Sequence, residues 1–107
     1  MLGDRHGIAA CWGGLGLVLA GKGDYEAALA CYRESLKGFR LIGNGVEVGR
    51  TLCHQGEALL KLGQRVRAAQ CFQEALAVAQ QGADRATVLA AVRRLVWLSK
   101  QSAGQEE

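Results

Sequence analysis

Apolar residues along this chain recur at helical spacing, and no segment alternates with the two-residue period of a strand. Ile8, Trp12, Leu15 and Leu19 follow one another at intervals of three and four residues, so they share one helix face. Glycines punctuate the pattern, since Gly23, Gly43, Gly63 and Gly82 fall near the ends of successive helical segments. The pattern predicts an all-α fold with helices over residues 7–21, 24–41, 46–62, 65–81 and 84–101.

An internal repeat organises these helices. A shift of 40 residues aligns the chain with itself, and a third copy begins at Asp84 but stops after half a period. The matched pairs include Gly16 with Gly56, Ala28 with Ala68, Tyr32 with Phe72, Glu34 with Glu74 and Leu36 with Leu76. We therefore expect one domain over residues 1–101. It comprises repeat 1 at about 4–43, repeat 2 at about 44–82 and a terminal helix at about 84–101, followed by a flexible tail at 102–107.

The repeated residues suit helix pairs that pack closely. Small side chains allow two helices to approach, and large ones fill the space between them. The terminal helix is either a cap or half of a truncated repeat, and Trp97 and Leu98 add to the residues that we expect to face inward. The residues predicted to pack the repeats are Trp12, Leu15, Gly16, Ala28, Tyr32, Leu52, Gly56, Ala68 and Phe72.

Trp12, Leu15-Gly16 and Leu19, followed by Ala28 and Tyr32, resemble the tetratricopeptide repeat. The match over the second period is looser, because Gln55 stands where the family prefers Leu, and the chain has no Pro after either helix pair. Its long period and its connectors, such as Leu2-Gly3-Asp4, resemble the variety found in bacterial signal-transduction NTPases and transcriptional regulators. The resemblance implies a right-handed α-α solenoid. It also implies a cytoplasmic, non-enzymatic scaffold or sensor module that is a fragment of a larger bacterial regulatory protein.

The resemblance further implies that the first helix of each pair lines a concave groove that binds a peptide or protein. In the first repeat the groove positions carry almost no side chain, because they are Ala10, Gly13 and Gly14. They also lack the Lys and Asn of the family's carboxylate clamp. Cys53 and Arg94 also map to groove positions. We expect an acidic or amphipathic peptide, and the alternative is a plain solvated face. The groove candidates are Leu17, Arg50, His54, Glu57, Lys61, Arg93, Trp97 and Lys100.

Two further classes of partner remain open, nucleic acid and a second copy of the chain. The 107 residues carry a net charge of +3, and the second half is mildly basic. Nucleic-acid binding through Arg65, Arg67, Arg93, Arg94 and Lys100 is the less favoured class, because this charge falls short of a typical footprint. Self-association through apolar solenoid ends is the main alternative. A membrane partner is not expected, since the longest apolar stretch, 15–20, is far below the ~20 residues needed to cross a bilayer.

The sequence offers little for catalysis, metal binding or cofactor binding. The four Cys are about 20 residues apart with no CxxC pair, which favours free thiols in a reducing compartment over a disulfide framework or a zinc site. His6 and His54 lie in different repeats. The stretch from Gly16 to Gly23 approaches a phosphate loop, but Gly23 stands where that motif needs Ser or Thr. We therefore expect neither an enzyme nor a cofactor.

Overall fold

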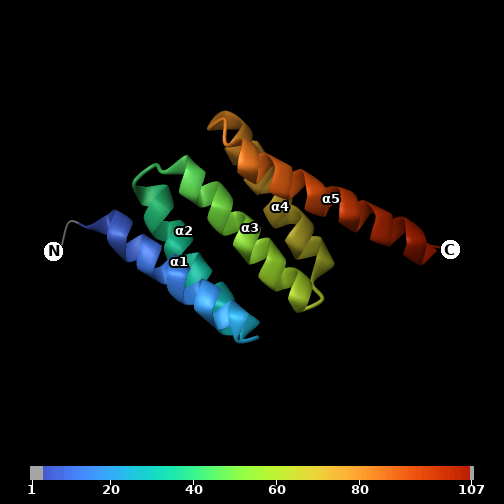
Figure 1. The fold of residues 1–107 in the computed structure, drawn as a ribbon, viewed down its shortest axis with the longest axis horizontal. Coiled ribbons are helices and arrows are strands. Elements are labelled where there is room, and N and C mark those ends of the chain that lie inside the picture. Colours follow the sequence, from blue (N-terminus) through green and yellow to red (C-terminus); the bar gives the residue numbers. More distant parts are fainter. Residues whose placement is uncertain (1–3, 107) are drawn as a thin grey trace.

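The computed structural model describes residues 4–106, with the backbone alone from residue 102 onward, and over that range it contains five helices and no strand (Figure 1). The all-α fold is thereby confirmed. The last helix runs beyond its expected end at residue 101, so that boundary is wrong, whereas the flexibility of residues 102–107 stays a prediction. Leu2, Gly3 and Glu107 lie outside the described residues. The helices are α1 (Arg5–Gly21), α2 (Tyr25–Leu41), α3 (Gly45–Lys61), α4 (Arg65–Gln81) and α5 (Arg85–Glu106).

Side-chain caps begin most of the helices. The carboxylates of Asp4 and Asp24 and the amide oxygen of Asn44 each accept a hydrogen bond from the backbone N–H three residues later, at 2.9, 3.2 and 3.2 Å. Asp84 accepts a hydrogen bond of 2.6 Å from the Thr87 hydroxyl. Gln64 makes no such bond, so α4 begins without a side-chain cap. These short polar residues mark where α1, α2, α3 and α5 start.

The connectors turn through a residue in the left-handed conformation. Gly23, Gly43 and Gly63 have φ of +86°, +71° and +78°, which glycine adopts without strain. The fourth connector differs from the expected punctuation. Gly82 caps α4 with φ of −88°, and Ala83 takes the left-handed position with φ of +54°. The glycine of this connector lies one residue too early, and a Cβ-bearing residue adopts the positive φ instead.

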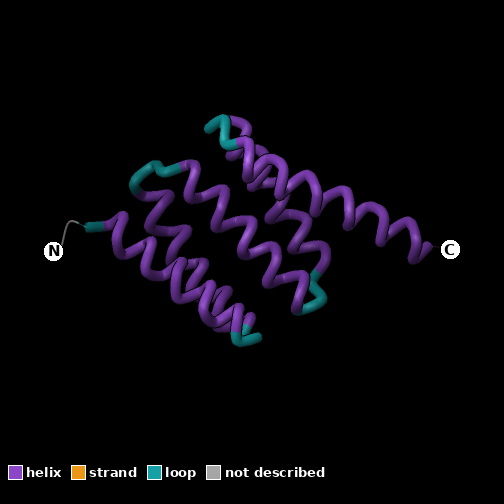
Figure 2. Tube along the Cα trace, in the orientation of Figure 1, coloured by secondary structure: helices purple, strands orange, loops and turns teal. Residues whose placement is uncertain are grey.

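The helices form two layers. α1 with α2 and α3 with α4 pack as hairpins, α3 also packs on α2, and α5 packs on α4. Figure 1 shows α1, α3 and α5 side by side in front, with α2 and α4 behind them, and Figure 2 shows the short turns at the ends of the hairpins. The molecule measures 56 × 31 × 17 Å, as expected for a flat stack of helix pairs, and the helical-repeat solenoid is confirmed.

Each hairpin closes around one glycine and one aromatic ring. A Cβ on Gly16 would lie 2.5 Å from Cε1 of Tyr32, and a Cβ on Gly56 would lie 2.7 Å from Cζ of Phe72. Both rings are fully buried, so neither can move aside, and glycine is required at both places. Of the other residues predicted to pack the repeats, the core also contains Ala28, Leu52 and Ala68.

Trp12 and Leu15 are corrections to the sequence analysis. We predicted that they pack the first repeat, but their side chains are 39% and 46% exposed. α2 packs on a neighbouring face of α1, the one that carries Ala9, Gly13 and Gly16, and it leaves Trp12 and Leu15 at the N-terminal edge of the stack. The amphipathic pattern therefore placed Trp12 and Leu15 correctly on one helix face, but the expectation that this face is packed inside the first repeat was wrong.

α5 also differs in part from its expected packing. Leu98 is buried with Ala91 against the rest of the core, whereas Trp97 is 40% exposed. At the position where α1 and α3 carry Gly16 and Gly56, α5 carries Val96, and that side chain is exposed. α5 thus packs on α4 without the glycine that would admit an aromatic ring of a further hairpin helix.

Candidate peptide-binding groove

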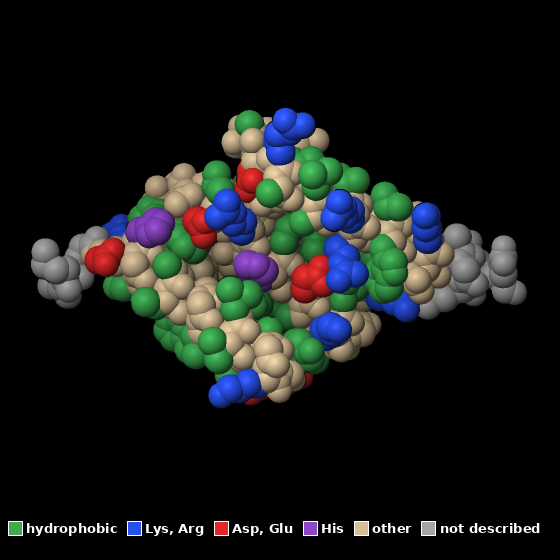
Figure 3. Space-filling model, viewed as in Figure 1, with side chains coloured by type: hydrophobic (Ala, Val, Ile, Leu, Met, Phe, Trp, Pro, Cys, Tyr) green, Lys and Arg blue, Asp and Glu red, His purple; other side chains and the backbone are tan. Residues whose placement is uncertain are grey.

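The layer of α1, α3 and α5 presents a face with three hollows, which we call the groove. One hollow of about 310 Å³ and one of about 270 Å³ lie between α1 and α3. A third of about 420 Å³ lies between α3 and α5. In Figure 3 the Lys and Arg side chains gather over α3 and α5, whereas the region over α1 is largely hydrophobic and uncharged.

The first hollow exposes helix backbone. Gly13, Gly14 and Leu17 of α1 form one wall, and Arg50 and His54 of α3 form the other. A Cβ on Gly14 would meet no atom within 4 Å, so close packing does not explain this glycine. A Cβ on Gly13 would lie 3.2 Å from the Ser35 hydroxyl oxygen, which donates a buried hydrogen bond to the Ala9 carbonyl at 2.9 Å. The bare backbone is available to a ligand.

The second hollow is lined by aromatic and apolar groups. The His54 ring stacks on Tyr32 with centroids 5.9 Å apart and planes 28° from parallel. Although part of the His54 side chain is exposed, the protein crowded around its ring lowers the pKa of His54 below its usual value. Burial likewise raises the pKa of Tyr32. Leu17, Tyr25 and Ala58 add apolar lining, and the hollow is bordered by two charged groups, Lys61 and Glu57.

The third hollow contains an ion pair across α3 and α5. Nε and Nη2 of Arg94 donate to the two carboxylate oxygens of Glu57, at 2.5 and 2.6 Å. The guanidinium also lies over the Trp97 ring, 5.5 Å from its centroid. Arg94 is therefore paired within the protein, and Ala90, Arg93 and Trp97 are the exposed lining residues.

Arg50 is also engaged. Its guanidinium lies 3.0 Å from Glu47 and 3.8 Å from Asp84. The hydrogen bond from Thr87 is the largest cause of a lowered pKa at Asp84, and Arg50 adds to the effect. By contrast, Lys61, Arg93 and Lys100 have no ion-pair partner within the described part of the chain. These three cations are therefore not neutralised by ion pairs among the described residues.

The structure brings most of the groove candidates together but not all of them. Lys100 lines none of the three hollows, and Cys53 is half-buried against the core instead of open to the groove. Sequence reasoning missed Tyr25, because it mapped groove positions only onto the first helix of each pair. It also missed the Glu47–Arg50 pair, which the three-residue spacing within one helix could have indicated. The candidates that line the hollows are Leu17, Arg50, His54, Glu57, Lys61, Arg93 and Trp97.

Reactive and metal-binding groups are sparse on this face. All four cysteines are free thiols, and burial is the largest cause of the rise in the pKa of Cys53, to about 11. Across the described residues, no group of three or more His, Cys, Asp or Glu side chains is placed to hold a metal ion. None of the five helices, as far as the structure describes them, is long and apolar enough to cross a membrane.

Comparison with known proteins gives one match. The model of the tetratricopeptide repeat family matches residues 7–81, which cover both helix pairs and exclude α5. No curated protein and no solved structure gives a significant match.

Proposed function

Because the chain belongs to the tetratricopeptide repeat family, whose repeats generally act as protein–protein interaction modules, we propose that it binds a peptide or protein in the groove of α1, α3 and α5. The observation that supports this most is the combination in the groove of bare backbone at Gly13-Gly14 with apolar surface at Leu17. A ligand can contact both without displacing a side chain.

The ligand chemistry follows from the charges that have no partner. Lys61 borders the second hollow and Arg93 borders the third, whereas Arg50 and Arg94 are already paired with carboxylates. We propose a peptide with apolar residues for the hollows and carboxylates for Lys61 and Arg93. Lys100, further along α5, would extend the same contacts.

The wider role is a scaffold or sensor part of a larger bacterial regulatory protein. The 40-residue period supports the long variety of repeat described for signal-transduction NTPases and transcriptional regulators. We propose a cytoplasmic location and no enzymatic activity, which fits a face where carboxylates pair with arginines instead of flanking a reactive group.

Self-association is the second candidate, and the exposed apolar side chains at the two ends of the stack favour it. Ile8 and Trp12 are exposed at one end, and Leu89, Val92 and Val96 at the other. Sedimentation at several concentrations tests it, and a strict monomer removes it. Nucleic-acid binding is less favoured, because Arg94 is neutralised by Glu57.

The groove is tested with peptides selected from a random display library against the intact chain. Combining Lys61→Ala with Arg93→Ala should weaken the selected peptides by at least about tenfold, or about 1.4 kcal/mol. The matched control combines Arg65→Ala with Arg67→Ala, which removes the same charge from exposed positions on α4 outside the hollows. Equal losses in both double variants would contradict the groove and leave only general charge attraction.

A further inference from the structure

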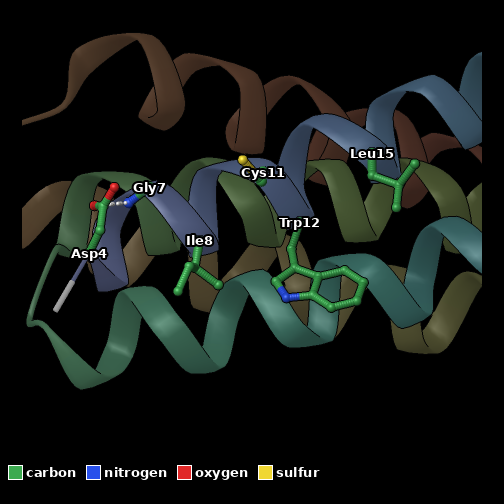
Figure 4. A pocket seen from close by; sticks show the side chains of 6 residues that line it. All are labelled: Asp4, Gly7, Ile8, Cys11, Trp12 and Leu15. Carbon is green, nitrogen blue, oxygen red and sulfur yellow. Dashed lines mark hydrogen bonds between the residues drawn. The ribbon is translucent and has the colours of Figure 1, made fainter. Parts of the chain in front are cut away.

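A second unpartnered surface lies at the N-terminal edge of the stack, away from the groove. Ile8, Cys11, Trp12 and Leu15 are all exposed on α1, and we call them the N-terminal apolar face. They line a shallow hollow of about 540 Å³, and Figure 4 shows that its lining comes from α1 and its Asp4 cap alone. Ile8 and Trp12 also border a hollow of about 340 Å³ that reaches Leu41 of α2.

In the second repeat, the equivalent face is covered by a helix. The 40-residue shift places Val48, Thr51 and Leu52 of α3 at the positions of Ile8, Cys11 and Trp12. These α3 residues are 6%, 5% and 2% exposed, whereas Ile8 is 53% exposed. α3 packs on α2, and no corresponding helix among the described residues packs on the outer side of α1. The same surface is therefore covered by a helix in one repeat and open in the other.

Charge extends the correspondence. On the covered side, Arg40 of α2 donates a 2.7 Å hydrogen bond to Glu74 of α4. The same shift places Glu34 at the position of Glu74, and Glu34 borders the hollow that contains Ile8 and Trp12. Its present partner is Lys37, at 3.4 Å. The Lys37 side chain is largely exposed and that of Glu34 partly exposed, so an incoming cation can replace that contact at little cost.

We propose that the N-terminal apolar face docks an amphipathic helix of a partner protein that has the pattern of α2. That helix presents an apolar stripe to Ile8, Trp12 and Leu15 and one cation to Glu34. The site is separate from the groove, so this proposal does not depend on the proposed groove ligand. A partner fits better than a second copy, because the two helices of each copy that carry this pattern, α2 and α4, are already packed between their own neighbours. The exposed α5 corresponds by the 40-residue shift to α1 and α3 and not to α2.

The test uses α2 itself as the probe. A labelled peptide of residues 24–42, with Cys31→Ser in the peptide, is titrated with the intact chain and followed by fluorescence anisotropy. We expect saturable one-to-one binding, and Trp12→Ala should weaken it by at least about tenfold. The matched control is Leu89→Ala, which truncates an exposed apolar residue on α5 and should leave the affinity within about twofold.

Charge exchange tests the register of the docked helix. Arg40→Glu in the peptide should weaken binding by about two- to fivefold, as expected for an exposed ion pair. Glu34→Arg in the protein should weaken the original peptide to a similar degree and restore binding of the altered peptide. Failure of this rescue while Trp12→Ala still weakens binding would overturn the α2-like register.

Alkylation of the cysteines shows where on the protein the peptide binds. Bound peptide should slow modification of exposed Cys11 and leave buried Cys31 of the protein unreactive. Reaction at Cys31 would mean that the peptide replaces α2, and the proposal would fail. It would also fail without saturable binding, with unchanged affinity in Trp12→Ala, or if the free chain formed a dimer that Trp12→Ala dissolves. That last result would assign the face to a second copy.

Discussion

α1 and α3 carry the same hydrophobic pattern and have opposite surroundings. In α3 the face that begins at Val48 and Leu52 is buried, and in α1 the face that begins at Ile8 and Trp12 is exposed. Both helices use glycine, Gly16 or Gly56, to meet an aromatic ring of their hairpin partner. The hairpin contact is therefore common to the two repeats, and only the contact between successive repeats differs.

This comparison shows that an amphipathic stripe identifies a face without identifying its neighbour. Trp12 is larger than Leu52, yet it is 39% exposed where Leu52 is 2% exposed, because no further helix among the described residues packs on that face of α1. The sequence pattern therefore predicts such a residue to be core, whereas the structure leaves it exposed.

The largest expected difference is in stability. Leu52→Ala should lower the free energy of unfolding by about 3 kcal/mol, because it empties a fully buried site. Trp12→Ala should cost less, about 1 to 2 kcal/mol, because 39% of the residue already lies in solvent. Urea unfolding of both variants measures the difference, and Leu52→Val serves if Leu52→Ala does not fold. Equal costs would mean that the two faces are equally covered and would break the comparison.

Thiol accessibility should give a smaller but direct contrast. Cys11 lies on the open face, and Thr51 occupies the equivalent position on the covered face, where it is 5% exposed. Two single-cysteine variants are compared: one keeps only Cys11, and the other has all four native cysteines changed to Ser and carries Thr51→Cys. Cys11 should react with iodoacetamide at least about tenfold faster, because the thiol at position 51 reacts only after local opening of the structure. Similar rates in the folded protein would contradict the coverage of α3 by α2.

The smallest expected effect is a pH dependence at the junction of α2 and α3. Because the pKa of His54 is lowered in the folded chain, the unfolded chain binds more protons in the window between the two pKa values. The stability contributed by neutral His54 is therefore present above its unfolded pKa of about 6.5 and is lost as the pH falls below it. In the His54→Gln variant, the free energy of unfolding should vary less with pH across this window than it does in the unaltered chain. α1 has Gly14 at this position and no such group. An unchanged pH profile would contradict the crowding of the His54 ring.

Most of the fold could be predicted from local signals. The capping residues Asp4, Asp24 and Asn44 mark three helix starts, although the expected starts at residues 7, 24 and 46 differ by one or two residues from those observed. Most connectors followed from glycine at the left-handed position. Ala83 was not foreseen, because a glycine one residue earlier gives the same sequence signal while the left-handed position falls on its neighbour. Local propensity thus locates a turn to within a residue but does not assign its dihedral angles.

The groove was predicted only in part, for reasons of side-chain pairing. Sequence placed Arg50 and Arg94 on the correct face, but Arg94 pairs with Glu57 and Arg50 also reaches Asp84, and both carboxylates are distant along the chain. Tyr25 was missed because it comes from the second helix of its pair and reaches the hollow beside His54. Contacts of this kind depend on how successive helices cross, which periodicity does not encode.

By itself, the sequence determined the number and type of elements, the 40-residue period, and the glycine–aromatic contact that closes each hairpin. These properties depend on spacing along one helix or on two helices joined by a short turn, so local steric rules are sufficient. Only the tertiary structure decided that Trp12 and Leu15 are exposed, which arginines are already paired, and that the N-terminal apolar face matches a buried one. Those properties depend on what packs against a helix, and one pattern is compatible with either a neighbour or solvent.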